Sequence, residues 1–346
     1  MTANRILVVF TGGTIGSRIA SDVINVVPGQ TYRLIDDYTR AGTTPVHFDV
    51  IEPVSILSEN ARPRDWSAIT RAITANVAAE HAGVIVTHGT DTLSYSAAAL
   101  TFALTDLRIP VVMVASDLPL EDPSANGSAN FRDAVDIIGR GFPSGVYVTY
   151  RNPDGRRLVH LGVRTLPPSP LDHFVYSACG RHLTESEGDG PHQWSASDIP
   201  GPRLSTDPQV RGNHEFSENV LLVRPYPGLN YDRLDISGCD AVVHDLYHSG
   251  TASAGGSPAQ NILNFASRCR AADIPLFCAP VPDNVGTYDS SGAFSSAGVV
   301  SAGQMRSEVA YVKASFGAGA GLRGEKLIEF VCQRSLAEEF LEIPGR

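Results

Sequence analysis

The chain has 346 residues, of which 42% are hydrophobic and 18% are charged, and its formal net charge at pH 7 is −10. This composition is that of a globular protein with room for two domains, and no uninterrupted apolar run approaches the ~20 residues of a membrane span. Because the net charge is negative and the arginines are scattered, we expect neither nucleic acid nor a membrane as a partner.

The first predicted strand, residues 5–10, breaks abruptly into a glycine-rich corner at residues 11–16. No secretory signal pattern precedes the strand, so we expect a cytoplasmic protein. The three glycines of the corner let the backbone adopt positive φ and approach a ligand closely. A P-loop is disfavoured because no Gly-Lys-Ser/Thr ending follows. What remains is a hydroxyl, that of Thr14, held on a tight loop at the end of a strand.

Residues 17–47 mix polar, proline and glycine residues with weak periodicity, which predicts a long flexible segment able to close over a site. A second strand over residues 48–54 leads to another polar corner, which carries Ser58 and Glu59. A helix then opens at Pro63. Its apolar stripe predicts packing against a core, through Trp66, Ile69, Ile73 and Val77.

The central stretch of the chain is a buried strand over residues 83–86 that feeds a helix through a polar corner at residues 87–92. Such a corner lies at the carboxyl end of a parallel strand, where open α/β sheets bind ligands, and it presents backbone N–H groups beside a helix start. The competing interpretation is that Thr90 or Asp91 only caps the helix.

The remaining elements alternate between strands and helices, which predicts a parallel sheet with crossover helices. In the first half these are strands 111–114 and 146–150, helix 130–139 and a hairpin over 150–161; in the second, strands 220–223, 241–244 and 276–279 and helices 258–271, 305–314 and 325–340. Between residues 180 and 218 apolar periodicity disappears. We predict a two-domain α/β fold, with a larger N-terminal parallel-sheet catalytic domain at 1–190, a linker at 191–217 and a smaller C-terminal α/β domain at 218–346.

Three weaker patterns predict no cofactor, no metal and no disulfide. Residues 319–324 fit the dinucleotide spacing Gly-x-Gly-x-x-Gly but follow a helix instead of a strand. His244, Asp245 and His248 lack a compact set of further metal ligands. The five cysteines are odd in number and contain no Cys-x-x-Cys pair, so we expect reduced thiols.

The three corners at residues 11–16, 58–60 and 87–92 end parallel strands of one sheet and should converge into one pocket. Two of them read Thr-Gly-Gly-Thr-Ile at 11–15 and His-Gly-Thr-Asp-Thr at 88–92. With these motifs the sequence resembles the L-asparaginase family, and most closely its bacterial cytoplasmic type I branch. Similar segments follow at residues 124–131, 226–228, 286–288 and 297–299.

The resemblance implies a two-domain subunit that hydrolyses asparagine to aspartate and ammonia without a cofactor. Thr14 would be the nucleophile, and neighbouring backbone N–H groups, including that of Thr90, would hold the oxyanion. Thr90 and Asp91 would form the second catalytic group. Substrate would be bound by Gly13, Gly89, Ser58 at the α-carboxylate, and Glu59 and Asp91 at the α-ammonium. A homodimer or homotetramer is implied, because family members complete each site with a neighbouring subunit's second domain.

Two positions depart from the family pattern. The mobile-loop tyrosine is replaced by Ile24, with Tyr32 nearby but out of register. The family lysine is replaced by Thr165, and the adjacent Arg164 is our candidate for its catalytic role. Arginine supplies charge but stays protonated, so it does not give up a proton as a lysine can.

These departures keep two alternatives open beside asparagine hydrolysis. One keeps the pocket but changes the substrate to glutamine, a β-aspartyl compound or another specialised amide. The other is a non-catalytic binder of asparagine or aspartate, which the intact Thr14, Thr90 and Asp91 disfavour.

Overall fold

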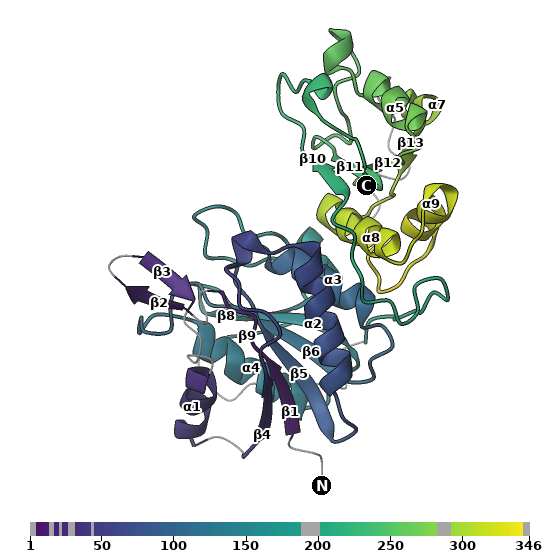
Figure 1. The fold of residues 1–346 in the computed structure, drawn as a ribbon. Coiled ribbons are helices and arrows are strands. Elements are labelled where there is room, and N and C mark those ends of the chain that lie inside the picture. Colours follow the sequence, from purple (N-terminus) through teal and green to yellow (C-terminus); the bar gives the residue numbers. More distant parts are fainter. Residues whose placement is uncertain are drawn as a thin grey trace. The chain divides into compact units, whose positions relative to one another are not determined.

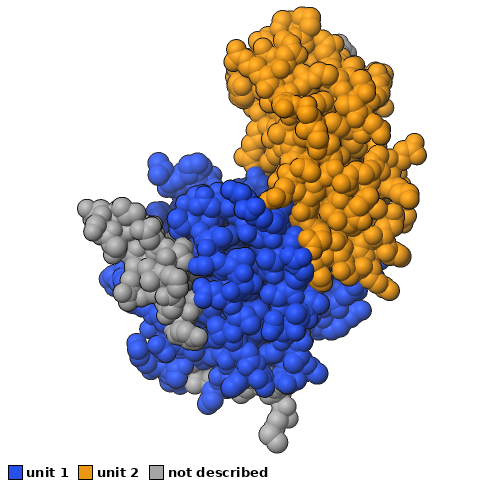
Figure 2. Space-filling model, in the orientation of Figure 1, with its two compact units in different colours: residues 1–206 blue, residues 207–346 orange. Residues whose placement is uncertain are grey.

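The computed structural model describes residues 5–13, 17–20, 23–26, 32–42, 45–187, 201–281 and 292–341. The chain forms two compact units, Met1–Thr206 and Asp207–Arg346, each built on its own sheet (Figures 1 and 2). The predicted two-domain α/β fold is therefore confirmed. The division between the units falls inside the segment 191–217 that we predicted as the linker; residues 191–200 of it lie outside the described part, and its exact extent stays a prediction.

Unit 1 contains a seven-stranded sheet in the order β4-β1-β5-β6-β7-β8-β9 (Figure 1). Its strands are β1 (Arg5–Val9), β4 (His47–Ile51), β5 (His81–Thr87), β6 (Pro110–Val114), β7 (Gly145–Arg151), β8 (Arg156–Leu161) and β9 (Thr184–Glu187). The strands from β4 to β7 are parallel, whereas β8 pairs antiparallel with both β7 and β9. The predicted parallel sheet and the hairpin are confirmed. Strand β9 was missed, because it lies where apolar periodicity is lost.

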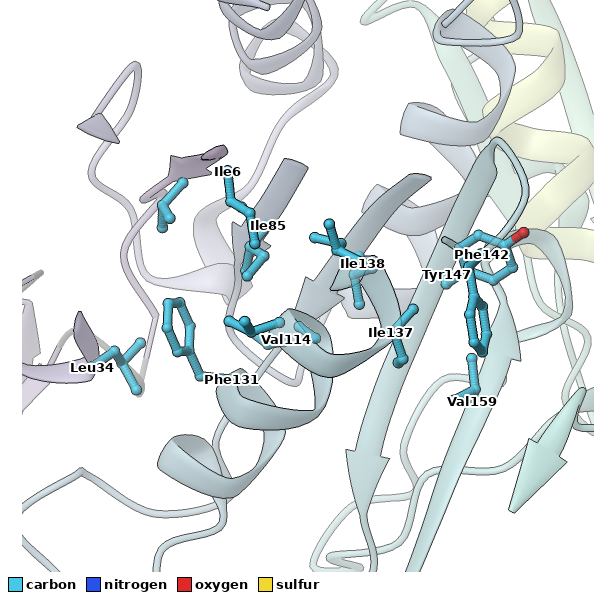
Figure 3. Close-up of a cluster of buried hydrophobic side chains, with 14 of the residues drawn as sticks. Ile6, Leu34, Ile85, Val114, Phe131, Ile137, Ile138, Phe142, Tyr147 and Val159 are labelled. Atoms are coloured by element: carbon cyan, nitrogen blue, oxygen red, sulfur yellow. The ribbon is translucent and has the colours of Figure 1, made fainter. Parts of the chain in front are cut away.

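Two helical layers cover this sheet: α1 (Tyr32–Arg40) and α4 (Gly127–Gly139) on one face, α2 (Pro63–Asn76) and α3 (Leu93–Ala103) on the other. Side chains alternate between the two faces along each strand, so Ile6 and Val8 join the first core and Leu7 and Val9 the second. Figure 3 shows the first core, with Phe131 of α4 beside Val114 of the sheet. Burial on both faces explains why the strands read as continuous apolar runs.

The segment that we predicted as flexible contains regular elements. Strand β2 (Ser17–Ala20) pairs antiparallel with β3 (Val23–Val26), and helix α1 follows. The helix buries Leu34 and Tyr38 against the first core. Leu34, Ile35 and Tyr38 share one face of α1, so an amphipathic pattern was present in the sequence and the interpretation of this segment as flexible overlooked it.

Unit 2 contains a four-stranded parallel sheet in the order β10-β11-β12-β13. Its strands are β10 (Val220–Val223), β11 (Ala241–Asp245), β12 (Leu276–Ala279) and β13 (Val299–Ser301), and its helices are α5 (Ile262–Ala271), α7 (Phe294–Ala297), α8 (Ser307–Gly319) and α9 (Gly324–Gln333). Strand β13 is only three residues long and was not predicted. Within the described ranges, no helix of the chain combines the length and the apolar character needed to cross a bilayer.

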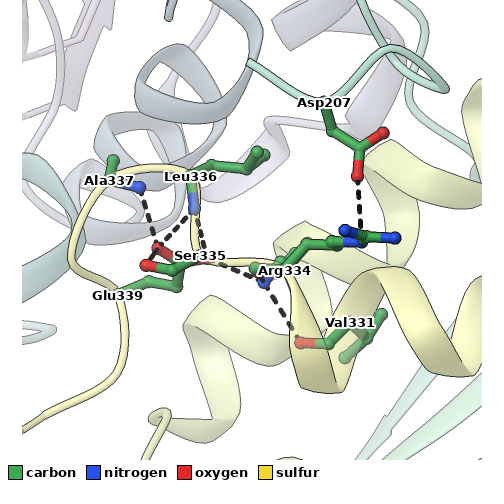
Figure 4. A network of polar contacts seen from close by, with 8 residues as sticks. Asp207, Val331, Arg334, Ser335, Leu336, Ala337 and Glu339 are labelled. Carbon is green, nitrogen blue, oxygen red and sulfur yellow. Dashed lines mark hydrogen bonds and ion pairs between the residues drawn. The ribbon is translucent and has the colours of Figure 1, made fainter. Parts of the chain in front are cut away.

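The last helix ends earlier than we predicted, because the chain after α9 turns back to a buried cation. The carboxylate of Glu339 accepts hydrogen bonds from the backbone N–H groups of Leu336 and Ala337 (Figure 4) and from Lys313 Nζ at 2.7 Å. Lys313 and Glu339 are almost completely buried. A charge buried this deeply needs a partner, which fixes the C-terminal turn against α8.

The glycines at 319–324 serve the joint between α8 and α9. A β-carbon on Gly319 would lie 2.1 Å from the carbonyl oxygen of Glu215, so only glycine fits there. The Gly-x-Gly-x-x-Gly spacing therefore connects two helices, whereas a dinucleotide-binding motif connects a strand to a helix.

Candidate active site

Backbone hydrogen bonds join the corner after β1 to the corner after β4. The amide of Gly13 donates to the carbonyl of Ile56 at 2.8 Å, and the amide of Ile56 donates to the carbonyl of Thr11 at 2.9 Å. Gly12 has a φ of +98°, and a β-carbon there would lie 2.3 Å from the Ile56 oxygen. This approach of two backbones therefore requires glycine.

The same corner also packs directly on the corner after β5. A β-carbon on Gly13 would lie 2.4 Å from the amide nitrogen of Gly89, and one on Gly89 would lie 2.4 Å from Ser58 Oγ. The three corners therefore meet at the carboxyl edge of the parallel strands β4, β1 and β5. Their predicted convergence is confirmed, and glycine is the residue that lets them come so close.

Ser58 and Asp91 form the polar contact of this meeting point. Ser58 is buried at the start of the short 3₁₀ helix η2 (Ser58–Asn60), and its hydroxyl donates to Oδ2 of the exposed Asp91 at 3.1 Å. The hydroxyl of Thr92 donates to the carbonyl of Ser58 at 2.8 Å and ties η2 to the start of α3. Asp91 accepts a hydrogen bond from the Ser58 hydroxyl, and among the described residues no backbone N–H group of α3 donates to it. This favours a role in the site over a role as the helix cap.

Thr90 is half-buried between these groups. Its carbonyl accepts from the amide of Leu93 at 3.3 Å, but its own amide N–H has no hydrogen-bond partner among the residues that the structure describes. Such an N–H group beside a helix start can hold a negative oxygen of a ligand. Glu59 follows Ser58 in η2, is exposed, and makes no hydrogen bond or ion pair to another described residue, so its role at the substrate ammonium stays a prediction.

The sequence reasoning missed His88, which is buried directly behind the corner. Its Nδ1 lies 2.8 Å from the carbonyl oxygen of Gly89, and its Nε2 lies 2.8 Å from Ser96 Oγ on α3. Ser96 Oγ in turn accepts from the indole nitrogen of Trp66 on α2 at 2.9 Å. Burial lowers the pKa of His88. The hydrogen bond to Gly89 and the charge of Asp91 raise this pKa, but burial is the larger effect, so the imidazole is neutral. Its place at the start of the His-Gly-Thr-Asp-Thr motif was the sequence signal that could have identified His88 as part of the site.

Arg164 ends the 3₁₀ helix η3 (Gly162–Arg164) that follows β8, and it is half-buried. This helix packs on α3 beyond its first turn, since a β-carbon on Gly162 would lie 2.6 Å from Thr101 Oγ1. Thr165 is buried, and its hydroxyl donates to the carbonyl of Leu161 at 3.0 Å, within its own turn. The catalytic role of Arg164 stays a prediction.

Several predicted positions lie outside the described residues or their described side chains. Thr14 lies between the described residues 13 and 17, and residues 286–288 lie in another undescribed segment. Ile24 belongs to β3 and Tyr32 begins α1, and their correspondence to the family tyrosine stays a prediction.

In unit 2, the weak metal-ligand pattern includes His244, and its Nε2 atom lies 3.0 Å from the hydroxyl of Tyr231.

Comparison with known proteins agrees with this fold. Residues 5–166 match the family model of the N-terminal region of asparaginases. The thermostable L-asparaginase from Thermococcus kodakarensis has a similar structure, with 26% sequence identity, a TM-score of 0.76, and coverage of 98% of this chain and 100% of that chain. L-asparaginase I from Vibrio cholerae, at 22% identity, a TM-score of 0.73, and 97% and 99% coverage, shares the fold.

Curated relatives extend the match along the sequence. A glutamyl-tRNA(Gln) amidotransferase subunit from Thermoplasma volcanium is 28% identical over 341 residues, which cover 97% of this chain and 80% of that protein. The protein of the same name from Thermoplasma acidophilum is 28% identical over 90% of this chain and 75% of its own length. Fold, corner and matches together define an asparaginase-type amidohydrolase, an enzyme class that cleaves amides. Residues 5–166 carry the N-terminal domain of the asparaginase family, and the whole chain is similar in structure to L-asparaginases. The narrower placement in the bacterial type I branch is not supported, because these relatives are amidotransferase subunits.

Proposed function

We propose that this enzyme hydrolyses the side-chain amide of a free amino acid, with asparagine as the leading substrate and Thr14 as the nucleophile. The proposal is carried by the contact between Ser58 Oγ and Asp91 Oδ2, 3.1 Å apart, at the place where three glycine-lined corners meet. A hydroxyl beside a carboxylate suits the head of an α-amino acid. Its carboxylate would accept from Ser58, and its ammonium, on the same carbon atom, would donate to Asp91.

Substrate binding would replace one hydrogen bond by two stronger ones. The hydroxyl of Ser58 now donates to Asp91. When it turns to the substrate carboxylate, Asp91 is released for the ammonium, and both new contacts are charge-assisted. Glu59 would add a second carboxylate near the ammonium, and the backbones of Gly13 and Gly89 would line the path of the side chain.

Catalysis would proceed in two steps through an ester of Thr14. Its hydroxyl oxygen attacks the amide carbon, and the oxyanion that forms is held by backbone N–H groups, including that of Thr90. The C–N bond then breaks and the nitrogen leaves as ammonia after taking up a proton. Water attacks the ester, which releases the acid and restores the hydroxyl. Thr90 and Asp91 would form the second catalytic group, and Arg164 would supply a positive charge.

Glutamine is the second candidate substrate, and the curated relatives favour it. Their name describes amide transfer onto glutamyl-tRNA(Gln), a reaction that needs nitrogen from an amide donor. Asparagine and glutamine differ by one methylene, which an apolar pocket distinguishes by only about 10–200-fold. The pocket that holds the head group serves either substrate, so the position of the amide relative to the nucleophile decides between them.

Ammonia release from asparagine, glutamine and a β-aspartyl dipeptide tests the proposal. We expect kcat/KM for asparagine to exceed that for glutamine by about tenfold or more, as expected for a misfit of one methylene. A higher value for glutamine or for the dipeptide would establish the alternative substrate. Aspartate binding in calorimetry without ammonia release from any of the three would make the protein a binder. Light scattering would test the proposed homodimer or homotetramer.

A further inference from the structure

We infer that Trp66, Ser96 and His88 form a positioning relay that aims the amide N–H of Thr90 at the carbonyl oxygen of the substrate amide. The inference rests on the proposed function, in which that N–H group holds the oxyanion. It assigns a task to three buried side chains that touch neither the substrate nor the nucleophile in the proposed mechanism.

The hydrogen bonds of the relay all run in one direction. An indole N–H can only donate, so Ser96 Oγ accepts from Trp66 at 2.9 Å and turns its own hydrogen toward His88 Nε2 at 2.8 Å. A backbone carbonyl can only accept, so the imidazole proton lies on Nδ1, 2.8 Å from the oxygen of Gly89. The neutral imidazole is therefore held in one tautomer, from both sides.

The peptide after Gly89 transmits this orientation to the site. A trans peptide is planar, so its carbonyl and its N–H point in opposite directions. Since the Gly89 oxygen is held on the side of His88, the N–H of Thr90 points away from it. That N–H has no hydrogen-bond partner among the described residues, which leaves it for a ligand.

Glycine makes such a restraint necessary. Position 89 has no room for a side chain, because a β-carbon would meet Ser58 Oγ at 2.4 Å. A glycine backbone has wide conformational freedom, so the peptide that follows it needs an outside restraint to keep one orientation. The relay provides this from α2 and α3, two helices packed on the same face of the sheet. A donor held by rigid elements loses little free energy to reorganisation during the reaction.

The substitution Ser96→Ala removes one donor of the relay with little change in shape, and Trp66→Phe removes the indole donor but also leaves a cavity in the core. Loss of a whole oxyanion donor lowers kcat by about 10²–10³, so we expect a loosened donor to lower kcat by roughly tenfold. KM should stay within about twofold, because the oxyanion forms only in the transition state. Ser94→Ala is the matched control: Ser94 is buried on the same helix, and its hydroxyl has no hydrogen-bond partner among the described residues.

Two substitutions of His88 separate hydrogen bonding from packing. Asparagine keeps an N–H donor near the position of Nδ1, whereas leucine fills the space without one. We expect His88→Asn to retain most of the wild-type kcat and His88→Leu to lose about tenfold, as for the other relay variants. Equal kcat values for His88→Leu and wild type, in a preparation that hydrolyses amides, would overturn the relay and leave the proposed function intact.

Nitrogen-15 NMR of the histidine rings tests the relay without any turnover. The wild type should show His88 with its proton on Nδ1, and Ser96→Ala should show a mixture of tautomers. A proton on Nε2 in the wild type would refute the relay directly. Absence of ammonia release by the wild type from every amide tested would refute the proposed function and the inference that rests on it.

Discussion

The contact between Gly89 and Ser58 makes Gly89→Ala the most informative structural substitution. A β-carbon at position 89 would lie 2.4 Å from Ser58 Oγ, 2.7 Å from Ser58 Cβ and 3.3 Å from Gly13 Cα. The hydroxyl can rotate away, but Cβ moves only with its backbone. Because carbon atoms at contact are about 3.5 Å apart, Ser58 has to shift by roughly 0.8 Å.

The shift should affect both stability and turnover. Overpacking of this size lowers the free energy of unfolding by about 1–3 kcal/mol. A displacement of about 1 Å at a site can lower turnover by roughly 10²-fold, so kcat/KM should fall by one to two orders of magnitude. Urea unfolding and ammonia release measure the two effects. Gly139→Ala is a control, because a β-carbon there meets nothing within 4 Å.

A double substitution tests whether Ser58 is the cause. In a Ser58→Gly background the Oγ and Cβ atoms are gone, so Gly89→Ala should then cost less than about 1 kcal/mol, a coupling expected only of residues in contact. The double variant should stay impaired in substrate binding, since it lacks the hydroxyl. If Gly89→Ala were as stable and as active as wild type, the three corners would not be in contact as described.

Three further predictions concern other parts of the chain. Asp91→Asn keeps the shape but removes the charge opposite the substrate ammonium, which costs about 1.5–3 kcal/mol, so kcat/KM should fall by at least tenfold; unchanged kinetics would restore the helix-cap interpretation. Lys313→Met leaves Glu339 buried without its cation and should lower the free energy of unfolding by about 3–5 kcal/mol. The loss should be smaller when Lys313→Met is combined with Glu339→Gln, and an equal loss in the single and the double variant would exclude the pairing. Burial, helped by the charge of His182, lowers the pKa of His160 from 6.5 to about 3. Because the unfolded chain then binds a proton that the folded chain does not, stability should fall as pH falls from 6.5 to 3, by up to about 1.4 kcal/mol per pH unit, and His160→Asn should flatten the urea-unfolding midpoints over that range.

The sheet and the corners could be predicted because their signals are local in the sequence. Strands buried on both faces read as apolar runs, as in residues 83–86, and glycines mark where the chain must turn tightly. The parallel direction of the strands follows from their alternation with helices, whereas their order in the sheet was not predicted. Convergence of the three corners needed only the rule that parallel strands end at the same edge of a sheet.

Strand β9 could not be predicted because it depends on pairing with β8, although its own sequence is polar. Helix α1 carried a local signal, because Leu34, Ile35 and Tyr38 share one face of the helix and pack on the core. The setting of His88 could not be predicted either. Its partners Trp66 and Ser96 lie on two helices, and only the fold brings them behind the corner.

Thr14 is the proposed nucleophile of this enzyme. Ammonia release by wild type and by Thr14→Ala, with asparagine and with glutamine, tests this assignment most directly. Position 14 belongs to a polar, glycine-rich stretch of the sequence and not to an apolar run, so we expect the variant to unfold at the same urea concentration as wild type. We predict that it loses nearly all turnover of both amides, because no other hydroxyl is expected to form the ester. Turnover within a few-fold of wild type would contradict the assignment.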